Sequence, residues 1–320
     1  MKESEVSRLV NAADSVALVS HTNPDGDAIG SLLALGMGLK RNGKTVWLLG
    51  DTPLPAIFHF LPGTDLYGGD LSGVVCDLVI YLDCASYERA AAHPLRYTTS
   101  LSIDHHADNT HFADYNWVDP QAAATGEMVY ELLRELHIEV DQAMATCLYA
   151  AIASDTGWFA YENTRFQTHQ ISAELLKAGV QPHRVAGQLQ LGRKYPALKL
   201  LGCALLSLKL EGGGKVAVMV LRRSDYERLG ARLEDANGIV QYGGMLRDVE
   251  VSVLLKESAP SEIAVSLRSF GDVNVQTIAS ALGGGGHVKA SGCTIHGDLD
   301  VARRRVLDVI GEAFGAGRSD

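Results

Sequence analysis

The fold is decided by residues 16–27, which read Val16-Ala17-Leu18-Val19-Ser20-His21-Thr22-Asn23-Pro24-Asp25-Gly26-Asp27. The first five residues form a largely apolar run that is typical of a buried strand. Pro24 and Gly26 then indicate a tight turn rather than a continued strand or helix. Residues 28–40 have helical character, so Asp27 lies near a helix N-terminus, where a carboxylate can cap the helix. An open α/β sheet presents its chemistry on such turns, at the carboxyl ends of its strands, although turns of this composition also occur without a ligand.

The same alternation continues through the first half of the chain. Apolar runs with little polar alternation predict further buried strands at residues 45–49, 78–82 and 100–103. Helical patterns are found at residues 28–40, 125–136, 142–153 and 168–177. Strands that alternate with helices predict an α/β fold with a mostly parallel sheet and helices on both faces.

The pattern changes between residues 181 and 196, where proline and glycine interrupt the periodicity. We therefore expect a catalytic domain at residues 1–185, a linker or connecting helix at 186–209 and a smaller α+β domain at 210–320. In the smaller domain, strands are expected at 216–221, 249–256, 262–268 and 290–295, and helices at 275–282 and 300–314.

Length and composition describe a globular protein. At 320 residues and 47% hydrophobic content, the chain is long and apolar enough for two full cores. No apolar run reaches the roughly 18 to 20 residues of a membrane span, and the start lacks the pattern of a secretory signal, so no membrane association is expected. Five scattered cysteines without a CxxC motif indicate reduced thiols and a cytoplasmic location.

The net charge of −10 restricts the nucleic acids that the protein can bind. A protein that follows a long strand would need a basic face, and the largest basic cluster is Arg303-Arg304-Arg305. A very short or single-nucleotide substrate remains compatible with this charge, because bound cations can invert it locally.

Acidic and imidazole side chains recur where predicted segments end. Asp83 follows the strand at 78–82, a trio that begins with Asp104 follows the strand at 100–103, and Asp155 ends a helix. Because parallel strands share one carboxyl edge, these side chains are expected to converge on one cleft. The full set is His21, Asp25, Asp27, Asp83, Asp104, His105, His106 and Asp155. Each residue alone is also compatible with ordinary turn or loop chemistry, and their common edge is what favours a site.

Five clustered carboxylates repel one another and require positive charge nearby. Two divalent cations supply that charge, and a set of oxygen ligands with some imidazole suits Mn²⁺ or Mg²⁺ better than metals that prefer thiolates.

The motifs are similar to those of a known family. His21 to Asp27, Asp83, Asp104-His105-His106 and Ser154-Asp155-Thr156-Gly157 resemble the four motifs of the DHH phosphoesterase superfamily. Ser266-Leu267-Arg268-Ser269 and Gly283-Gly284-Gly285-Gly286-His287 resemble its associated DHHA1 domain. The resemblance covers about residues 14–300 with the motifs in order, and the helix start at 123–127 resembles the stand-alone nanoRNase and pAp phosphatase branch.

The resemblance implies a centre of two Mn²⁺ ions, for which Mg²⁺ can substitute. One ion would be held by His21, Asp25 and Asp83, and the other by Asp27, Asp83, His106 and Asp155, with Asp83 bridging them. Asp104 would orient neighbouring groups, and His105 would face the scissile phosphate as a donor or acid. Two such ions bind phosphate oxygens and lower the pKa of a shared water, so that hydroxide forms near neutral pH.

The resemblance also implies a substrate end in the smaller domain. Arg268, Gly284, Gly285, Gly286 and His287 would grip one nucleotide end in a cleft between the domains, opposite the metals. A glycine run after a helix also suits a simple helix C-cap and loop. Its functional interpretation is that backbone N–H groups without Cβ neighbours approach a phosphate closely.

The expected activity is Mn²⁺-dependent hydrolysis of short RNA oligonucleotides to mononucleotides and of 3′-phosphoadenosine 5′-phosphate (pAp) to AMP. A phosphodiesterase for cyclic dinucleotides (c-di-AMP or its linear product pApA) would use the same residues. A RecJ-like exonuclease of long single-stranded DNA is disfavoured, because no oligonucleotide-binding domain is appended. The glycine loop disfavours a manganese pyrophosphatase, and the intact ligand positions disfavour a catalytically inactive nucleotide-binding relative. A homodimer is left open.

Overall fold

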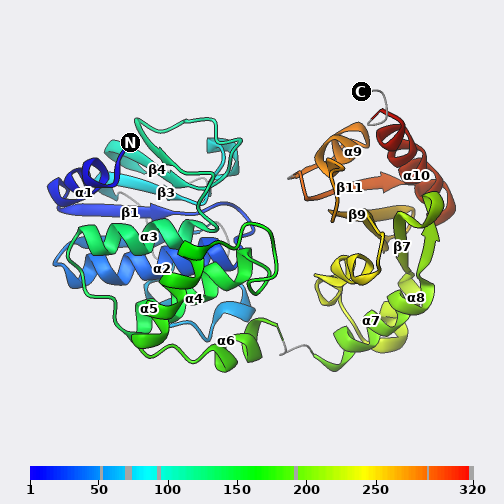
Figure 1. Ribbon diagram of the computed structural model, residues 1–320, viewed down its shortest axis with the longest axis horizontal. Helices are drawn as coiled ribbons and strands as arrows, with labels where there is room; N and C mark the ends of the chain where they lie inside the picture. Colours follow the sequence, from blue (N-terminus) through cyan, green and yellow to red (C-terminus); the bar gives the residue numbers. More distant parts are fainter. Residues whose placement is uncertain (51–52, 69–73, 92–94, 191–193, 287, 317–320) are drawn as a thin grey trace. The chain divides into compact units, whose positions relative to one another are not determined.

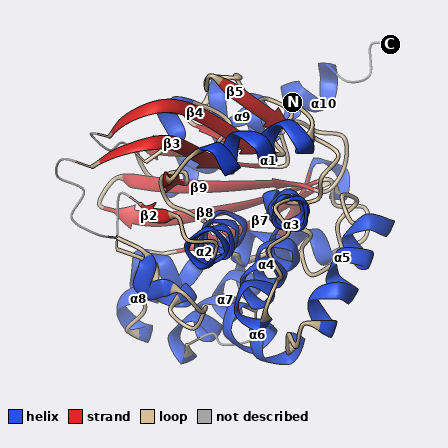
Figure 2. Ribbon diagram, turned by 90° about the vertical axis from the view of Figure 1, so that its left-hand side faces the viewer, coloured by secondary structure: helices blue, strands red, loops and turns tan. Residues whose placement is uncertain are grey.

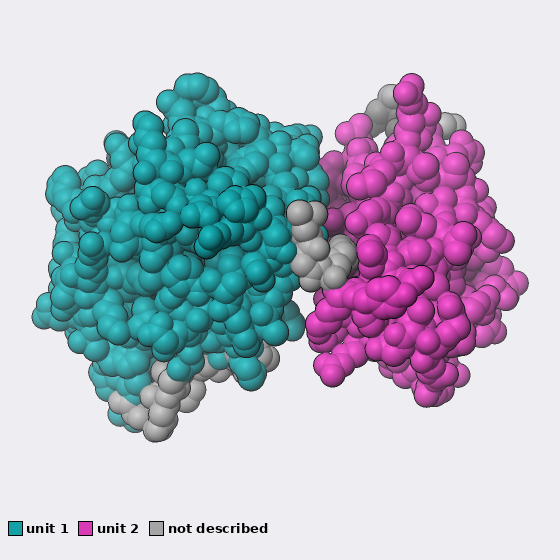
Figure 3. Space-filling view, turned by 90° about the horizontal axis from the view of Figure 1, so that it is seen from below, with its two compact units in different colours: residues 1–192 teal, residues 193–320 magenta. Residues whose placement is uncertain are grey.

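The structure is a computed structural model, and it describes residues 1–50, 53–68, 74–91, 95–190, 194–286 and 288–316. The chain divides into two compact units, unit 1 (Met1–Gly192) and unit 2 (Arg193–Asp320), which Figure 3 distinguishes by colour. The division falls within the connecting segment expected at residues 186–209.

Unit 1 is built on a five-stranded sheet in the order β2-β1-β3-β4-β5, in which every pair is parallel. Figure 2 shows two of its strands, β3 and β4, side by side. The strands are β1 (Ser15–Val19), β2 (Thr45–Leu49), β3 (Val75–Leu82), β4 (Arg96–Asp104) and β5 (Tyr115–Val118). The first four coincide with the predicted apolar runs, and the mostly parallel sheet is confirmed. β5 was not predicted.

The helices of unit 1 lie on one side of this sheet. They are α1 (Glu3–Ala12), α2 (Gly26–Arg41), α3 (Thr125–Glu135), α4 (Gln142–Asp155), α5 (Phe166–Lys177) and α6 (Pro182–Leu189) (Figure 1). Leu18, Ile80 and Ile103 point from the strands into the core that these helices close. Because side chains alternate along a strand, the neighbouring residues point to the opposite face.

The opposite face of the sheet packs against connecting segments. Ala17, Val79 and Tyr81 pack there with Ala90 and Phe112, which lie in connecting segments. The prediction placed helices on both faces, but among the described residues the second face is covered by loops and the short 3₁₀ turn η3 (Tyr87–Arg89).

Glycines bring three helices of unit 1 into close contact. A Cβ atom on Gly30 of α2 would lie 2.4 Å from the carbonyl oxygen of Cys147 in α4. A Cβ atom on Gly126 of α3 would lie 2.7 Å from the Cβ of Ala151, also in α4. Both contacts are closer than a side chain permits, so glycine at these positions sets the spacing of α2, α3 and α4.

Unit 2 contains a six-stranded sheet in the order β10-β11-β9-β8-β7-β6. Its strands are β6 (Lys209–Glu211), β7 (Val216–Leu221), β8 (Val251–Ala259), β9 (Glu262–Ser269), β10 (Gly285–Gly286) and β11 (Ala290–His296). β7 and β8 are parallel and the other pairs are antiparallel, as expected for an α+β domain.

Helices cover both faces of the unit 2 sheet. They are α7 (Tyr195–Ser207), α8 (Arg223–Leu229), α9 (Val275–Ala281) and α10 (Leu299–Ala316). Val253 and Leu267 pack against α9 and α10, whereas Met219 and Leu254 pack against α7 and α8. Each unit therefore has a core of its own.

None of the helices in the described ranges is long and apolar enough to cross a membrane. All five cysteines are free thiols, and four of them are buried.

Candidate metal centre

The carboxyl edge of the unit 1 sheet gathers the predicted site residues. Asp83 directly follows β3, Asp104 is the last residue of β4, and His21 lies just after β1. α2 begins and α4 ends at the same place, because glycine contacts hold these helices together there. We call the whole set the carboxylate–imidazole cluster: His21, Asp25, Asp27, Asp83, Asp104, His105, His106 and Asp155.

One side of the cluster is formed by His21, Asp25 and Asp83. The Nε2 atom of His21 lies 3.6 Å from Asp83 Oδ2 and 3.9 Å from Asp25 Oδ1. The three ligand atoms are close enough to share one metal ion. Asp25 also caps α2, since its Oδ1 accepts hydrogen bonds from the backbone N–H groups of Asp27 and Ala28.

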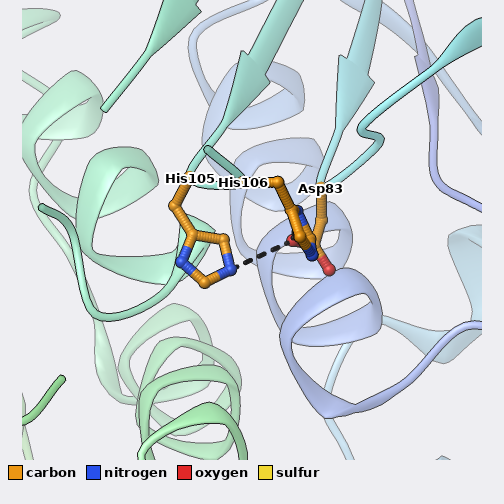
Figure 4. A group of neighbouring side chains, drawn as sticks. All are labelled: Asp83, His105 and His106. Carbon is orange, nitrogen blue, oxygen red and sulfur yellow. Dashed lines mark ion pairs between the residues drawn. The ribbon is translucent and has the colours of Figure 1, made fainter. Parts of the chain in front are cut away.

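The other side of the cluster is organised around His105. Its Nε2 atom lies 3.4 Å from Asp155 Oδ2, 3.6 Å from Asp83 Oδ1 and 3.8 Å from Asp27 Oδ2. Figure 4 shows this imidazole directed at Asp83. His105, Asp27 and Asp155 form a second group that is close enough to share an ion.

His106 has a different environment from the one expected. Its Nδ1 atom lies 2.7 Å from Asp104 Oδ1 and 3.7 Å from Asp83 Oδ1. The sequence interpretation gave His106, with Asp27 and Asp155, to the second ion and directed His105 at the phosphate. The structure instead places His105 beside Asp27 and Asp155, because Asp104 engages the ring of His106.

Asp83 belongs to the group of His21 and Asp25 and also to a third group, with His105 and His106. Through the 3.6 Å contact of its Oδ1 with His105 it also reaches the group of Asp27 and Asp155, as a bridging ligand would. Its backbone is left-handed, with φ of 60°, a conformation that aspartate tolerates better than most residues. The side chain is only 2% exposed, and its Oδ1 accepts a hydrogen bond of 3.1 Å from the hydroxyl of Thr125.

The start of α3 fixes Asp27. The backbone N–H of Thr125 donates to Asp27 Oδ2 at 2.6 Å, and that of Gly126 donates to Oδ1 at 2.9 Å. Both carboxylate oxygens therefore receive donors from a helix N-terminus, which favours the ionised form. The sequence indicates the helix start at residues 123–127 but not this role, which depends on a contact across about 100 positions.

Asn109 was also missed. This buried residue donates from Nδ2 to Asp104 Oδ2 at 2.6 Å and to the carbonyl oxygen of Cys84 at 3.0 Å. The other oxygen of Asp104 accepts from the backbone N–H of His105 and contacts His106. Asn109 therefore orients the carboxylate of Asp104, which in turn orients the imidazole of His106. Its position three residues after His106 is the only signal that the sequence offers.

The side chains of the cluster do not balance their own charges. Burial, followed by the charges of Asp83 and Asp155, raises the pKa of Asp27 well above its usual value. Burial, with the charges of Asp83 and Asp25, also raises the pKa of Asp155 to about 6. The same carboxylates raise the pKa of His105 to about 9, although burial of the ring opposes this shift. Excess negative charge in a buried site is what a divalent cation would relieve.

Asp83 is the exception within the cluster. Burial opposes its ionisation, but His21 and the charges of His106 and His105 hold the pKa of Asp83 below its usual value. The residue that contacts both groups is therefore ionised and able to serve as a ligand near neutral pH.

The donor set fits hard divalent cations. Carboxylate oxygens outnumber imidazole nitrogens in the groups, and cysteine contributes to none of them in the described part of the chain. Such sets suit Mn²⁺ and Mg²⁺ better than thiolate-preferring metals.

In unit 2, Arg268 and the glycine run lie near the same end of the sheet. Arg268 on β9 pairs in register with Ala290 of β11, and Ser291 of β11 pairs with Gly286 of β10. A Cβ on Gly284 would lie 2.2 Å from the carbonyl oxygen of Gly292, so this tight hairpin requires glycine there. His287, which the sequence analysis assigned to the substrate, lies outside the described residues.

A phosphoester-cleaving site is consistent with this fold and cluster, and known families match both units. The DHH family, N-terminal domain, matches residues 15–152, and the DHHA1 domain matches residues 212–314. The chain belongs to the DHH family, whose members are hydrolases that act on phosphoester bonds.

Within the family, the chain is similar to a particular group of enzymes. The bifunctional oligoribonuclease and PAP phosphatase NrnA of Thermus thermophilus is 36% identical over 302 residues, which is 93% of this chain and 89% of the relative. The protein of the same name from Bacillus subtilis is 29% identical and covers 96% of this chain and 97% of its own length.

Solved structures share the fold. An exopolyphosphatase-related protein from Bacteroides fragilis superposes with a TM-score of 0.90 at 24% identity, covering 97% of this chain and 95% of that chain. The exonuclease RecJ bound to manganese superposes with a TM-score of 0.51 at 12% identity, covering 98% and 94%.

Proposed function

We propose that this protein is a divalent-metal-dependent phosphoesterase, with Mn²⁺ as its working ion, that cleaves short RNA oligonucleotides to mononucleotides and removes the 3′-phosphate of pAp. The observation that carries the proposal is the convergence of the carboxylate–imidazole cluster at one sheet edge. The names of the relatives support the substrate class.

The ligand assignment follows the distances within the cluster. His21, Asp25 and Asp83 would hold one ion, and Asp27, Asp83, His105 and Asp155 would hold the other. Two divalent ions at such a site supply Lewis acidity for the phosphate oxygens and a nucleophile at neutral pH. The backbone N–H groups of Thr125 and Gly126 fix the direction of the Asp27 carboxylate, so this ligand is oriented before any ion arrives.

His106 becomes the candidate general acid in this assignment. Burial lowers its pKa, but the hydrogen bond to Asp104 and the charges of Asp83 and Asp104 raise the pKa more. These contacts favour the protonated ring, which is the form that can deliver a proton to the departing oxygen. Asp104, with both oxygens engaged by Asn109, His105 and His106, orients the ring without reacting itself.

Unit 2 is proposed to bind the nucleotide end of the substrate. Arg268 offers a planar fork of donors that suits a phosphate. Gly285 is exposed, and a Cβ atom there would meet nothing within 4 Å, so its backbone is accessible to a ligand. Gly284 and Gly286 shape the hairpin that displays it, and His287 is proposed to act beside them.

A substrate panel tests the proposal. The purified protein would be assayed with Mn²⁺ on pAp, dinucleotide RNA, c-di-AMP and long single-stranded DNA, with and without a chelator. We expect rapid, chelator-sensitive turnover of pAp and dinucleotide RNA. Long DNA degraded at the rate of the dinucleotide, or c-di-AMP as the fastest substrate, would contradict the proposed specificity.

A further inference from the structure

Residues 119–124 link β5 to α3. They contact the carboxylate–imidazole cluster but do not belong to it. The carbonyl oxygen of Ala122 lies 3.2 Å from Nδ1 of His105, so this ring nitrogen carries the proton and donates it to the carbonyl. The other nitrogen, Nε2, is then the one that faces the carboxylates of Asp155, Asp83 and Asp27 and that would bind a metal ion held among them. The position of Ala122 therefore sets both the tautomer and the direction of His105.

Asn163 ties this segment to the end of α4. Its Nδ2 donates to the carbonyl oxygen of Ala123 at 3.0 Å and to that of Asp155 at 3.1 Å. Because both partners are acceptors, the amide nitrogen has to face them, and its two hydrogens are both used. One side chain thus joins the residue after Ala122 to the backbone of a candidate metal ligand.

Glu127 holds the same segment from α3. This side chain is only 4% exposed, and its Oε2 accepts from the backbone N–H of Ala123 at 3.0 Å. Arg165 lies 3.8 Å from Oε2 and offsets part of the buried charge. Ala123 is therefore fixed at its N–H by Glu127 and at its carbonyl by Asn163.

The bonding of Asn163 suggests that general stability is not its main role. Its Oδ1 is buried and has no hydrogen-bond partner within the described chain. An unmatched buried oxygen is costly, which offsets much of what the two donated bonds contribute. The arrangement is well suited to holding two carbonyl groups at a fixed separation.

We propose that Asn163 is a positioning residue for the metal centre, which sets the distance between His105 and Asp155 by joining Ala123 to the backbone of Asp155. The inference rests on the proposed metal-dependent function. It predicts that loss of the two amide donors weakens metal binding at the group of Asp27, His105 and Asp155, although Asn163 itself contacts no ion.

The test compares Asn163→Leu with a matched control, Asn116→Leu. Leucine keeps the approximate volume of asparagine and adds no charge. Asn116 also donates from Nδ2 to two backbone carbonyl groups, those of Ala113 at 2.7 Å and His111 at 3.3 Å, but none of these residues belongs to the cluster. Mn²⁺ binding would be titrated by electron paramagnetic resonance, and kcat would be measured as a function of Mn²⁺ concentration.

We expect Asn163→Leu to bind one of two Mn²⁺ ions about 10–100-fold more weakly than the unchanged protein, as is typical when a residue behind a metal ligand is lost. The control should bind both ions normally, and excess Mn²⁺ should restore most of kcat in Asn163→Leu. Asn163→Ser, whose single donor cannot join both carbonyl groups, replaces the first variant with the same expectations if that variant does not fold.

Equal Mn²⁺ affinities for Asn163→Leu and the unchanged protein would overturn the inference, as would an equal loss of affinity in the control. If the unchanged protein bound no Mn²⁺, the proposed function would fail independently of Asn163.

Discussion

At the scale of single residues, Asp83 combines three properties that no other member of the cluster shares. It belongs to two of the three candidate metal groups and contacts His105 of the remaining one, its backbone is left-handed, and its pKa is held below the usual value. Asparagine tolerates the same backbone conformation and keeps the size of the side chain, but it carries no charge. Asp83→Asn therefore removes the negative charge of the side chain and leaves its size and backbone conformation unchanged.

We expect Asp83→Asn to lower kcat/KM for pAp at least about 100-fold, equivalent to about 3 kcal/mol of lost transition-state stabilisation. Bound Mn²⁺, measured by elemental analysis, should fall as well, since one carboxylate contacts both groups. Near-normal activity with two bound ions would show that Asp83 is not a bridging ligand.

Asp155 gives a prediction about pH in protein stripped of metal. Its pKa is raised to about 6, so its contribution to folding stability is fully present below the unfolded value of 3.8 and is lost as the pH rises through 6. At pH 8 the ionised carboxylate destabilises the fold. Asp155→Asn should therefore raise the unfolding temperature in a chelator at pH 8 by about 2–4 °C, for about 1 kcal/mol.

The control for Asp155→Asn is the same measurement at two further conditions. At pH 4, where the native carboxyl is largely protonated, the advantage of the variant should disappear. With excess Mn²⁺ at pH 8 the unchanged protein should have the higher unfolding temperature, because Asp155→Asn has lost a proposed metal ligand. If Asp155→Asn had the higher unfolding temperature by the same amount under all three conditions, the proposed role of Asp155 as a metal ligand would be contradicted.

Two neighbouring glycines, Gly284 and Gly285, are expected to differ in role: the first is needed for the fold and the second for substrate binding. A Cβ atom on Gly284 would collide with the carbonyl oxygen of Gly292, whereas one on Gly285 would meet nothing within 4 Å. Gly284→Ala should therefore lower the unfolding temperature. Gly285→Ala should fold normally and raise KM for pAp severalfold, because the new methyl group stands where a ligand approaches. An unchanged KM would remove Gly285 from the substrate site.

The sequence predicted which residues form the carboxylate–imidazole cluster, but it did not predict every contact that these residues make. Segment ends carry the acidic and imidazole residues, and a parallel sheet brings such ends to one edge. Which of His105 and His106 faces Asp155 depends on ring directions set by Asp104 and Ala122. Asn109 and Asn163 act through hydrogen bonds to residues that no local pattern places beside them.

At the scale of helices and strands, the contact of α2 with α4 controls the distance between the two halves of the cluster. Asp27 lies in the first turn of α2, and Asp155 is the last residue of α4. Gly30 permits the approach, since a Cβ atom there would lie 2.4 Å from a backbone oxygen of α4.

We expect Gly30→Ala to destabilise the protein by about 1–3 kcal/mol through overpacking, and to weaken Mn²⁺ binding. Gly311→Ala is the matched control. This glycine lies in α10 with nothing near its Cβ position, so alanine there should be neutral or stabilising by up to about 1 kcal/mol. Chemical denaturation and a Mn²⁺ titration of both variants measure the two effects. Equal stability of the two would exclude tight packing at Gly30.

Elements marked by a clear apolar run or by cap residues were predictable, whereas several elements without such marks were not. β1 to β4 and α2 to α5 lie close to the predicted ranges, because apolar runs and cap residues mark them. β5 and α8 have only four and seven residues, so they depend on pairing and packing rather than on local pattern. Pro182 was interpreted as an interruption, but it occupies the first turn of α6, where proline is well tolerated.

At the scale of the whole molecule, each unit has its own core, and all three candidate metal groups lie in unit 1. Length and the change of pattern near residue 190 were sufficient to predict two domains. Their limits at 185 and 210 stay predictions, because loop segments between packed cores carry little pattern.

We expect differential scanning calorimetry to resolve two unfolding transitions, of which only one responds to Mn²⁺. An ion at 100 times its dissociation constant stabilises the native state by about 2.7 kcal/mol, which shifts the transition of a unit of this size by about 5–10 °C. The metal-insensitive transition is the internal control. A single transition that moves with Mn²⁺, or two that both move, would contradict the assignment of the ions to unit 1 alone.

The confinement of the cluster to unit 1 also has a consequence for biosynthesis. Unit 1 is one continuous piece of chain that ends at Gly192, and the last member of the cluster is residue 155. A ribosome adding about 5–20 residues per second needs about 6–26 s to make the 128 residues from 193 to 320. During that interval the nascent chain already carries every proposed metal ligand, so a metal ion could be captured before unit 2 is complete.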